Sequence, residues 1–503
     1  MLLDYSSSFH YVMALLPELV LSVWGMVVLI AGVSRKQGAG SGQELGWLAL
    51  AGLALAAVAN GWLYSGVSEV GTGAMITVDR FRLFANWVFI LGAALSIVIS
   101  LAYVARQRLQ AGEYYSLILF AVVGMMFMGS ARDLMMIFLG LELMSIGIYA
   151  LAGFNRRDRR SAEAGLKYFL LGAFASGFLL FGIALVYGAA GSTNISAVAA
   201  AVQDGTTVGA LMIPGVALLA IGFAFKVSAV PFHMWVPDVY EGAPTPVTAF
   251  MAASVKTAAF VAFLRVFLVG LDGLYEDWFG ILWWIAAITM IAGNVIALVQ
   301  SSVKRMLAYS SIAHGGYLLV AIVAANDTAT SGLLFYLLVY TIMTIGAFAV
   351  VVTVGNQGEA NARIEDYGGF GWRKPVLGVL MTVLLLSLAG FPGTAGFIAK
   401  YHVLLGAAES RLWILIVILV LTTVMSYWYY LRVAWYMWMK EAPEGADSAD
   451  PAITPFATRI VLVVSVAIII LAGIFPDAAL DLTESSAESL RQIATEAGAA
   501  AGP

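Results

Sequence analysis

A lysine occurs in a stretch of the chain that is otherwise apolar enough to lie inside a membrane. Lys226 follows the run Leu218–Phe225 and is itself followed by more apolar residues. A lysine at the centre of a bilayer costs about 2.5–3.5 kcal/mol on insertion scales, so such residues are functional by default. Lys256, Lys400 and Glu142 lie in other apolar stretches. These four side chains can bind and release protons, and they predict proton transfer within a membrane.

Glu142 is the expected partner of Lys226. Burial disfavours the charged form of a lysine, whereas a nearby carboxylate favours it. A coupled glutamate–lysine pair can therefore hold a proton when the two groups are close and release it when they separate. Glu142 is the only acid predicted deep in a span, because Glu18 falls near a span end. The alternative is a static buried ion pair that only fixes helix packing.

Two histidines extend this set. His314 could relay protons between Lys256 and Lys400, and His233 could serve the same water path. The alternatives are histidines hydrogen-bonded in the helix bundle, or axial ligands of a haem, although no helix carries paired histidines. Some hydroxyl side chains could hold waters along the path or serve only packing: Ser145, Ser228, Thr257 and Tyr309.

The composition shows which elements must position these groups. The chain has 503 residues, of which 61% are hydrophobic and 11% charged, whereas a soluble domain has about 25% charged residues. Apolar runs of about 20 residues alternate with short polar breaks, which indicates an all-α protein that crosses a membrane many times. We predict fourteen spans: 11–33, 45–65, 81–104, 115–130, 133–153, 165–188, 210–234, 246–268, 278–300, 306–325, 332–354, 376–407, 412–438 and 456–475.

The titratable groups fall near the middle of their spans. At about 1.5 Å per helical residue, Lys256 lies roughly 15 Å from its span start, half of a ~30 Å hydrocarbon core. Glu142 and His314 lie roughly 14 Å from the starts of their spans. Lys400 lies roughly 14 Å before Glu409, at the end of its span. Arg265 and Arg432 fall near span ends, where long side chains can reach the headgroups, and Lys167 lies about one turn inside span 6, where the same is expected.

Two spans are expected to be broken. Pro231 interrupts span 7, and Pro392 with neighbouring glycines interrupts span 12. Broken helices five spans apart are typical of transporters with inverted repeats, although ordinary proline kinks are the alternative. We predict an N-terminal three-helix segment (1–114), a first repeat of spans 4–8 (115–270), an inverted repeat of spans 9–13 (271–440), and a last helix with a short tail (441–503).

The distribution of basic residues predicts the orientation. With the N-terminus outside, fifteen Lys and Arg residues fall in inside loops and five in outside segments. An even span count then puts both termini outside. The loop between spans 7 and 8 is an exception, because Asp238 and Glu241 bring no cation. The arginine-rich loop 156–160 is the strongest inside signal, with lipid-headgroup contact as a second interpretation.

The tail from Asp477 is expected to form a short frayed helix outside the membrane.

Several classes of function are excluded. The chain has no cysteine, so it cannot hold an all-thiolate iron–sulfur cluster or a disulfide. It has no phosphate-cradling glycine motif. The net charge of −4 and the lack of a long basic tract give no indication of nucleic-acid binding. The N-terminus lacks the basic start and cleavage site of a signal peptide, so we expect it to begin the first membrane helix.

The motifs around these residues resemble those of the antiporter-like membrane subunits of respiratory complex I. The block Phe225–Val247 is the most specific, and it continues to Lys256. Three further motifs agree: Leu139–Leu143 in span 5, Lys304–His314 in span 10, and Gly390–Phe397 before Lys400. The lysine in span 12 and the end after span 14 are most similar to the N-type group, rather than to the M-type or L-type groups.

The resemblance implies roles for these residues and for partners. Glu142 and Lys226 would be the coupling pair, Lys256 the central relay and Lys400 the exit group. NADH, FMN, iron–sulfur clusters and quinone would be bound by other membrane and peripheral subunits, with no cofactor in this chain. The protein would move protons in the inner membrane of a bacterial cell, among lipids, with both termini periplasmic.

Other functions remain open at this point. The same residues would serve the equivalent subunit of a plastoquinone-linked complex, a membrane hydrogenase or a multisubunit Na⁺/H⁺ antiporter. A self-contained secondary transporter would need a solute cavity. A passive structural spacer would tolerate the loss of all three lysines except in assembly or stability.

Overall fold

The protein is a bundle of membrane helices. The computed structural model describes residues 2–4, 7–34, 42–66, 68–70, 75–203, 209–355, 363–442 and 455–499. Within these residues, twelve helices are long and apolar enough to cross a membrane. Two shorter apolar helices, α9 and α17, each begin an interrupted span. Together they account for the fourteen predicted spans, so the predicted all-α membrane fold is confirmed.

The spans that cross the membrane without a sharp break are α2 (Leu16–Val33), α3 (Gln43–Gly66), α4 (Arg80–Arg106), α5 (Ala111–Ser130), α6 (Leu134–Ala152), α7 (Arg159–Ala190), α13 (Tyr275–Leu298), α14 (Val303–Ala324), α15 (Asp327–Val354), α19 (Trp413–Met439) and α20 (Phe456–Ile474). Span 8 is continuous but changes its winding, through α11 (Thr245–Phe250), the π-helical turn η1 (Met251–Val255), α12 (Lys256–Arg265) and a second π-helical turn η2 (Val266–Gly270).

The remaining elements lie between or after the spans. They are β1 (Leu2–Asp4), α1 (Ser8–Ala14), β2 (Ser68–Val70), α8 (Ile195–Gln203), the 3₁₀ turns η3 (Asp272–Leu274) and η5 (Ile364–Tyr367), α16 (Phe370–Arg373) and α21 (Asp477–Ala499). The strands β1 and β2 pair in parallel.

Polar residues at the helix starts define where several spans begin. Asp79, Asp133 and Asp158 each accept a hydrogen bond from a backbone N–H in the first turn of α4, α6 and α7. Ser302 and Asn326 do the same for α14 and α15. Such N-caps satisfy donors that have no partner within the helix.

Both predicted helix breaks are present. Span 7 consists of α9 (Met212–Lys226), an irregular segment around Pro231, and α10 (Trp235–Gly242). Span 12 consists of α17 (Pro375–Ala389), a turn, and α18 (Ala395–Glu409). Gly390 has φ +87°, a left-handed conformation that ends α17 at little cost for a glycine. Each break therefore interrupts the helical hydrogen bonds of the backbone inside the protein, next to a lysine.

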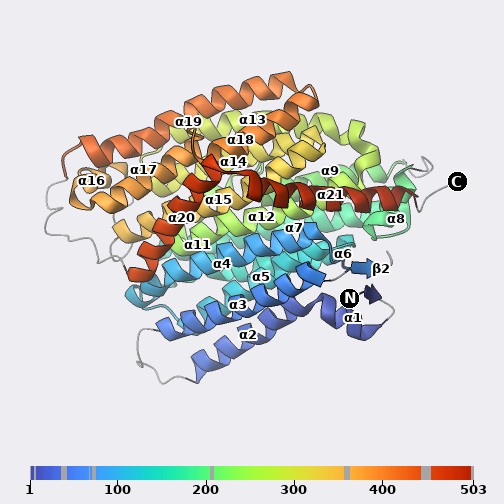
Figure 1. Cartoon of the computed structure of the whole chain (residues 1–503), viewed down its shortest axis with the longest axis horizontal. Coiled ribbons are helices and arrows are strands. Elements are labelled where there is room, and N and C mark those ends of the chain that lie inside the picture. Colours follow the sequence, from blue (N-terminus) through green and yellow to red (C-terminus); the bar gives the residue numbers. More distant parts are fainter. Residues whose placement is uncertain are drawn as a thin grey trace.

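The long helices lie side by side along the bundle, with α2 and α3 at one edge and α13 and α19 at the other (Figure 1). The red helices α20 and α21 cross the face nearest to the viewer (Figure 1). The core is continuous across the spans, and α14 and α15 are buried along nearly their whole length.

The predicted helix from Asp477 is present, but it is longer than expected and packed against the bundle instead of frayed. The helix α21 has 23 residues and packs against α15, α4 and α8. Its Thr483 Oγ1 lies 2.9 Å from Ser331 Oγ, and Arg491 Nη1 pairs with Asp327 Oδ2 at 2.8 Å. The alanine-rich composition did not indicate that this helix is amphipathic. Its buried side includes Leu490. Within the predicted last segment, residues 443–454 and 500–503 lie outside the described part of the chain.

Candidate functional site

Lys226 is the last residue of α9, directly before the first break, and its side chain is buried. Its Nζ donates hydrogen bonds to Ser145 Oγ at 2.7 Å and to Tyr149 Oη at 3.2 Å, both on α6. The Phe225 carbonyl oxygen accepts hydrogen bonds from the Ser228 backbone N–H at 3.2 Å and from Trp235 Nε1 at 3.2 Å. The break thus places an amine at a helix C-terminus, where a positive charge is stabilised by the helix dipole.

Glu142 does not form the expected ion pair with Lys226. It lies one turn before Ser145 on α6, so the lysine contacts a hydroxyl on the neighbouring turn of the same helix. Glu142 Oε1 has no hydrogen-bond partner among the described residues. Leu139 and Ile146, on the same side of α6, are exposed at the outer surface of the chain. The carboxyl group is therefore positioned between Lys226 and that surface.

Lys256 begins α12 directly after the π-helical turn η1 and is 1% exposed. Its Nζ donates to Ser311 Oγ at 2.5 Å and to the Ser311 carbonyl oxygen on α14. A π-helical turn rotates the residues that follow it relative to a regular helix, and such turns often occur at functional sites. Here the turn precedes the lysine that faces α14.

His314 is fully buried on α14 and uses both ring nitrogens. Its Nδ1 lies 2.6 Å from Tyr336 Oη on α15, and its Nε2 lies 3.1 Å from Tyr430 Oη on α19. Tyr430 in turn bonds to Ser310 Oγ. The imidazole is held between two hydroxyl groups, each of which can donate or accept a proton. Neither nitrogen is free to ligate a haem iron.

Lys400 lies on α18, just after the second break, and is also buried. Its Nζ donates to the Ala389 carbonyl oxygen at 2.9 Å, which is at the end of α17. The same Nζ lies 4.9 Å from the centre of the Tyr317 ring on α14. The lysine therefore satisfies a backbone group that the break leaves free.

One side of α14 connects the second and third lysines. Ser311, His314 and Tyr317 are three residues apart, so they follow one another along one side of the helix. Ser311 contacts Lys256, and Tyr317 lies under Lys400. His314 stands between them, with its ring centre 5.6 Å from that of Tyr317. The structure thus brings Lys256, His314 and Lys400 together.

His233 does not join this group. It lies in the break between α9 and α10, partly buried, and its Nδ1 has no hydrogen-bond partner among the described residues. Of the predicted site residues, Lys226 and Glu142 lie around α6, Lys256, His314 and Lys400 around α14, and His233 is separate.

The hydroxyl partners were mostly missed in the sequence. Ser145 was considered as a water ligand, but Tyr149, Ser311, Tyr317 and Tyr430 were not. A signal was present for some of them, because Tyr149 follows Glu142 by seven residues and Tyr317 follows His314 by three. Tyr430 had none, because it reaches His314 from a helix more than a hundred residues away.

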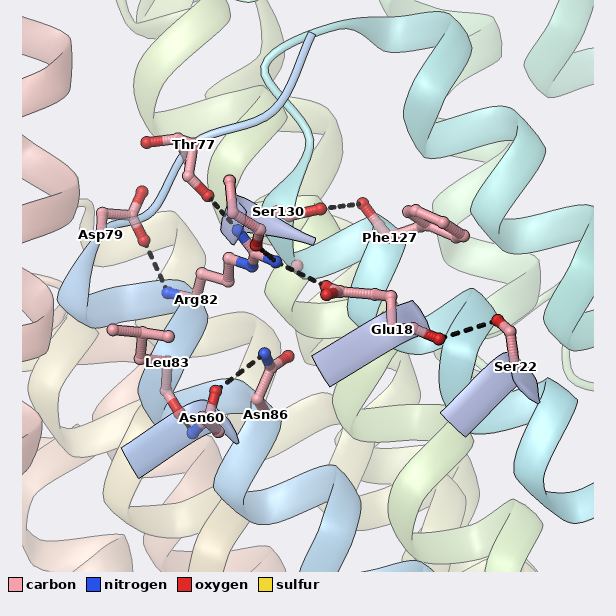
Figure 2. Close-up of polar contacts among 12 residues, drawn as sticks. Glu18, Ser22, Asn60, Thr77, Asp79, Arg82, Leu83, Asn86, Phe127 and Ser130 are labelled. Atoms are coloured by element: carbon pink, nitrogen blue, oxygen red, sulfur yellow. Dashed lines mark hydrogen bonds and ion pairs between the residues drawn. The ribbon is translucent and has the colours of Figure 1, made fainter. Parts of the chain in front are cut away.

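A second buried polar group was also missed, at the ends of α2, α4 and α12. Arg82 Nη2 pairs with Glu18 Oε1 at 2.7 Å, and Arg82 also donates to the carbonyl oxygens of Thr77 and Ala14, both at 2.8 Å (Figure 2). Arg265 pairs with Asp79 at 2.9 Å, and Asp79 caps α4 through the Arg82 backbone N–H. We call these four charged residues the charged clasp.

The charged clasp corrects one expectation. Arg265 does not extend to the headgroups, because it is 1% exposed and bonds to Asp79 and to the Gly129 carbonyl oxygen. Glu18 lies near the start of its span as predicted, in the first turn of α2, and it is buried there. Both charges are paired, as burial requires. Next to them, Asn86 donates to Asn60 Oδ1 at 3.0 Å (Figure 2).

The acidic segment α10 is neutralised by other elements. Arg305 on α14 pairs with Asp238 at 3.0 Å and with Glu241 at 2.9 Å, and Lys167 on α7 pairs with Asp238 at 3.1 Å. The exception to the charge bias is thereby explained, since the cations come from neighbouring helices.

Comparison with known proteins identifies the family. Residues 131–426 match the family model described as "NADH:quinone oxidoreductase/Mrp antiporter, TM". A protein of Trichlorobacter lovleyi named NADH-quinone oxidoreductase subunit N is 47% identical, over 94% of this chain and 96% of its own length. A protein of the same name from Gemmatimonas aurantiaca is 43% identical, over 95% and 94%.

Solved structures agree with this assignment. A chain of respiratory complex I from Thermus thermophilus with bound aureothin superposes with a TM-score of 0.77 at 33% identity, covering 92% of this chain and 98% of that one. A chain of the Mrp complex from Dietzia superposes with a TM-score of 0.82 at 21% identity, covering 96% and 99%, which shows a shared fold. This chain therefore belongs to the NADH:quinone oxidoreductase/Mrp antiporter transmembrane family, within the group of NADH-quinone oxidoreductase subunit N.

Proposed function

We propose that this chain is the proton-translocating membrane subunit of a bacterial NADH:quinone oxidoreductase. Its protons move along Lys226, Lys256, His314 and Lys400, and redox chemistry in other subunits drives the movement. NADH, FMN, iron–sulfur clusters and quinone bind to those partner subunits. Relatives at 40–47% identity with the subunit N name favour this assignment over an antiporter or hydrogenase subunit.

The first step in this mechanism is a change of partner at Lys226. Its amine now contacts Ser145 and Tyr149, and the carboxyl group of Glu142 lies one turn along α6. Approach to Glu142 favours the ammonium form, and return to the hydroxyl groups favours release of the proton. We assign Glu142 as the group that sets whether Lys226 holds its proton.

The second step transfers the proton through the centre of the chain. Lys226 passes it to Lys256 through water, Lys256 passes it to His314, and His314 passes it to Lys400, which releases it outside. A neutral imidazole can accept a proton on one nitrogen and donate from the other. Tyr336 and Tyr430 would hold its orientation during this exchange. His233, which lies in the break, would serve the water path to Lys226.

The energies involved are compatible with this switch. Moving one charge against 100 mV costs about 2.3 kcal/mol. A change of two pKa units at one lysine corresponds to about 2.7 kcal/mol. A modest change in the surroundings of one amine is therefore large enough to move a proton across the membrane.

The observation that supports the proposal most directly is the arrangement on α14. Two amines that are costly to bury face the same helix, since Lys256 bonds to Ser311 and Lys400 lies over the ring of Tyr317. His314 lies between these two residues on α14. A structural spacer has no need for two buried amines that face one helix with no carboxylate partner among the described residues.

The test is to measure proton pumping by the assembled complex in proteoliposomes. We expect Lys226→Ala, Lys256→Ala and Lys400→Ala each to lower the number of protons moved per NADH, because each removes one station. The matched control is Lys440→Ala, since Lys440 lies at the exposed end of α19. Native gels would verify equal assembly. Unchanged pumping in Lys226→Ala would refute the mechanism.

The same assay separates the rival functions. A self-contained transporter would move protons or a solute when this chain is reconstituted alone. A passive spacer would keep full pumping in a triple lysine variant once it assembled. Replacing Na⁺ by choline in the buffer tests the ion, since proton transfer should continue at the same rate.

A further inference from the structure

A large cavity opens at the end of α6 where this helix turns into α7. Its volume is about 1020 Å³, which reaches the upper end of the ~300–1,000 Å³ typical of ligand sites. Its walls come from α2, α5, α6 and α7 and from the connections before α5 and before α7. The mechanism proposed above makes no use of this space.

The cavity combines an apolar wall with a basic rim. Apolar side chains that line it include Leu117, Phe120 and Ile146, and also Leu166 and Phe169 on α7. Ile146, Leu166 and Phe169 are at least half exposed at the outer surface of the chain, so the cavity opens toward the interior of the membrane. An occupant that enters by this route must be largely apolar.

The rim carries an excess of positive charge. Three arginines line the cavity, Arg108, Arg156 and Arg157, against one acid, Glu113. Arg156 and Arg157 belong to the loop with the strongest predicted inside signal, which places the rim at the headgroup level of the inner leaflet. Arg108 is held with φ +52°, a conformation that costs energy for a residue other than glycine. A basic pocket between membrane helices on this side suits an anionic headgroup.

We propose that this cavity binds one anionic phospholipid of the inner leaflet. Its phosphate interacts with Arg108, Arg156 and Arg157, and its acyl chains lie along the apolar wall between α5, α6 and α7. A zwitterionic lipid would offer these three guanidinium groups a phosphate but no net negative charge, so their charge excess would remain. A transmembrane helix of another subunit would fill the apolar part but would not by itself neutralise the rim.

The bound lipid would lie next to the proton path. Tyr149 lines the cavity, and its hydroxyl group lies 3.2 Å from Lys226 Nζ. A lipid chain against the Tyr149 ring would hold this hydroxyl toward the lysine. This consequence depends on the proposed function of Lys226, whereas the lipid site itself does not.

The binding test uses the assembled complex in nanodiscs of phosphatidylcholine with a small fraction of phosphatidylglycerol that carries a photoreactive acyl chain. Peptide mapping after illumination should find the label in 109–120 and 146–169. The double variant Arg156→Gln/Arg157→Gln should raise the half-saturating lipid fraction about 25-fold, since each cation near the surface contributes about fivefold. The control is Arg159→Gln/Arg160→Gln, which removes equal charge from positions outside the cavity lining. It should shift binding by less than about threefold.

A second variant leaves every charge in place. Ala150 is exposed within the cavity lining, so Ala150→Phe fills the apolar part and should abolish labelling. Equal labelling by a photoreactive phosphatidylcholine, or equal effects of the two arginine doubles, would overturn the proposal. Absence of label in the wild-type complex would overturn it too, because another subunit would then occupy the cavity.

The link to Lys226 has its own measurement. Protons moved per NADH should be higher in vesicles with phosphatidylglycerol than in phosphatidylcholine alone for the wild type, and equal in both for Ala150→Phe. Equal values for the wild type would overturn the link and leave the labelling result standing. If Lys226→Ala pumps normally while the lipid still labels, the proposed function fails and the lipid site does not.

Discussion

Gly315 lies where α14 approaches both the first break and the second lysine. A Cβ at this position would lie 2.9 Å from the Val227 carbonyl oxygen and 3.8 Å from Lys256 Nζ. The first distance is shorter than side-chain carbons tolerate, so only a glycine lets α14 come this close. This residue, which has no chemistry of its own, therefore sets the spacing between the end of α9 and Lys256.

We predict that Gly315→Ala lowers proton translocation by about tenfold, because displacing a reacting group by about 1 Å can cost up to 10²-fold in rate. The control is Gly177→Ala, where a Cβ would meet nothing within 4 Å. Proton pumping and NADH oxidation in the same vesicles provide the measurement. If both variants pump as the wild type does, the close approach at Gly315 has no role in the transfer.

At the scale of elements, the breaks after α9 and α17 have a different role from the charged clasp. The second break frees the Ala389 carbonyl oxygen inside the protein, and Lys400 donates a hydrogen bond to it. At the first break, Trp235 adds a hydrogen bond to the Phe225 carbonyl oxygen. The clasp joins the N-terminal helices α2 and α4 to α12, which carries Lys256 at one end and Arg265 at the other. It therefore fixes one end of the helix that presents a relay lysine.

We predict that Arg265→Met destabilises the chain by about 3–5 kcal/mol, since it leaves the Asp79 carboxylate buried without its charged partner. Asp79→Asn should cost a similar amount but keep the cap of α4, because asparagine also accepts a hydrogen bond at this position. The double variant Asp79→Asn/Arg265→Met should recover much of the loss, as both charges are gone.

Thermal unfolding of the purified complex provides the measurement for the charged clasp. Arg80→Met is a suitable control, since Arg80 is exposed and follows Asp79 directly, at the start of α4. Additive effects of the two single substitutions in the double variant would show that Asp79 and Arg265 do not act as a pair.

At the scale of the whole molecule, an even number of spans puts the two ends of the chain on the same side of the membrane. Figure 1 agrees in placing α1 and the far end of α21 at the same end of the bundle. Which side this is follows from charge alone, and we propose the outside for both termini. The outer surface is rich in exposed apolar residues on α6, α7, α19 and α20, as expected for contact with lipid and with other subunits.

Introduced cysteines would test the orientation without background, since the chain has no cysteine. We predict that Glu484→Cys on α21 reacts with an impermeant maleimide added outside intact cells. Arg157→Cys, in the loop between α6 and α7, should react only after permeabilisation. Mass-tag shifts on gels provide the readout, and reaction of Arg157→Cys in intact cells would reverse the assigned orientation.

The sequence by itself determined the class of fold and the residues that bear the chemistry. Burying an amine in a membrane is so costly that Lys226, Lys256 and Lys400 stand out without any coordinates. Apolar length gave the spans, and prolines at 231 and 392 gave the breaks, because both effects are local.

Only the tertiary structure decided how these residues pair. Lys226 contacts Ser145 and Tyr149 rather than Glu142, His314 lies between Tyr336 and Tyr430, and Arg265 is buried against Asp79. Each of these contacts joins helices far apart in the chain. The contact between two helix faces depends on packing around small residues such as Gly315. Local sequence patterns do not predict that packing.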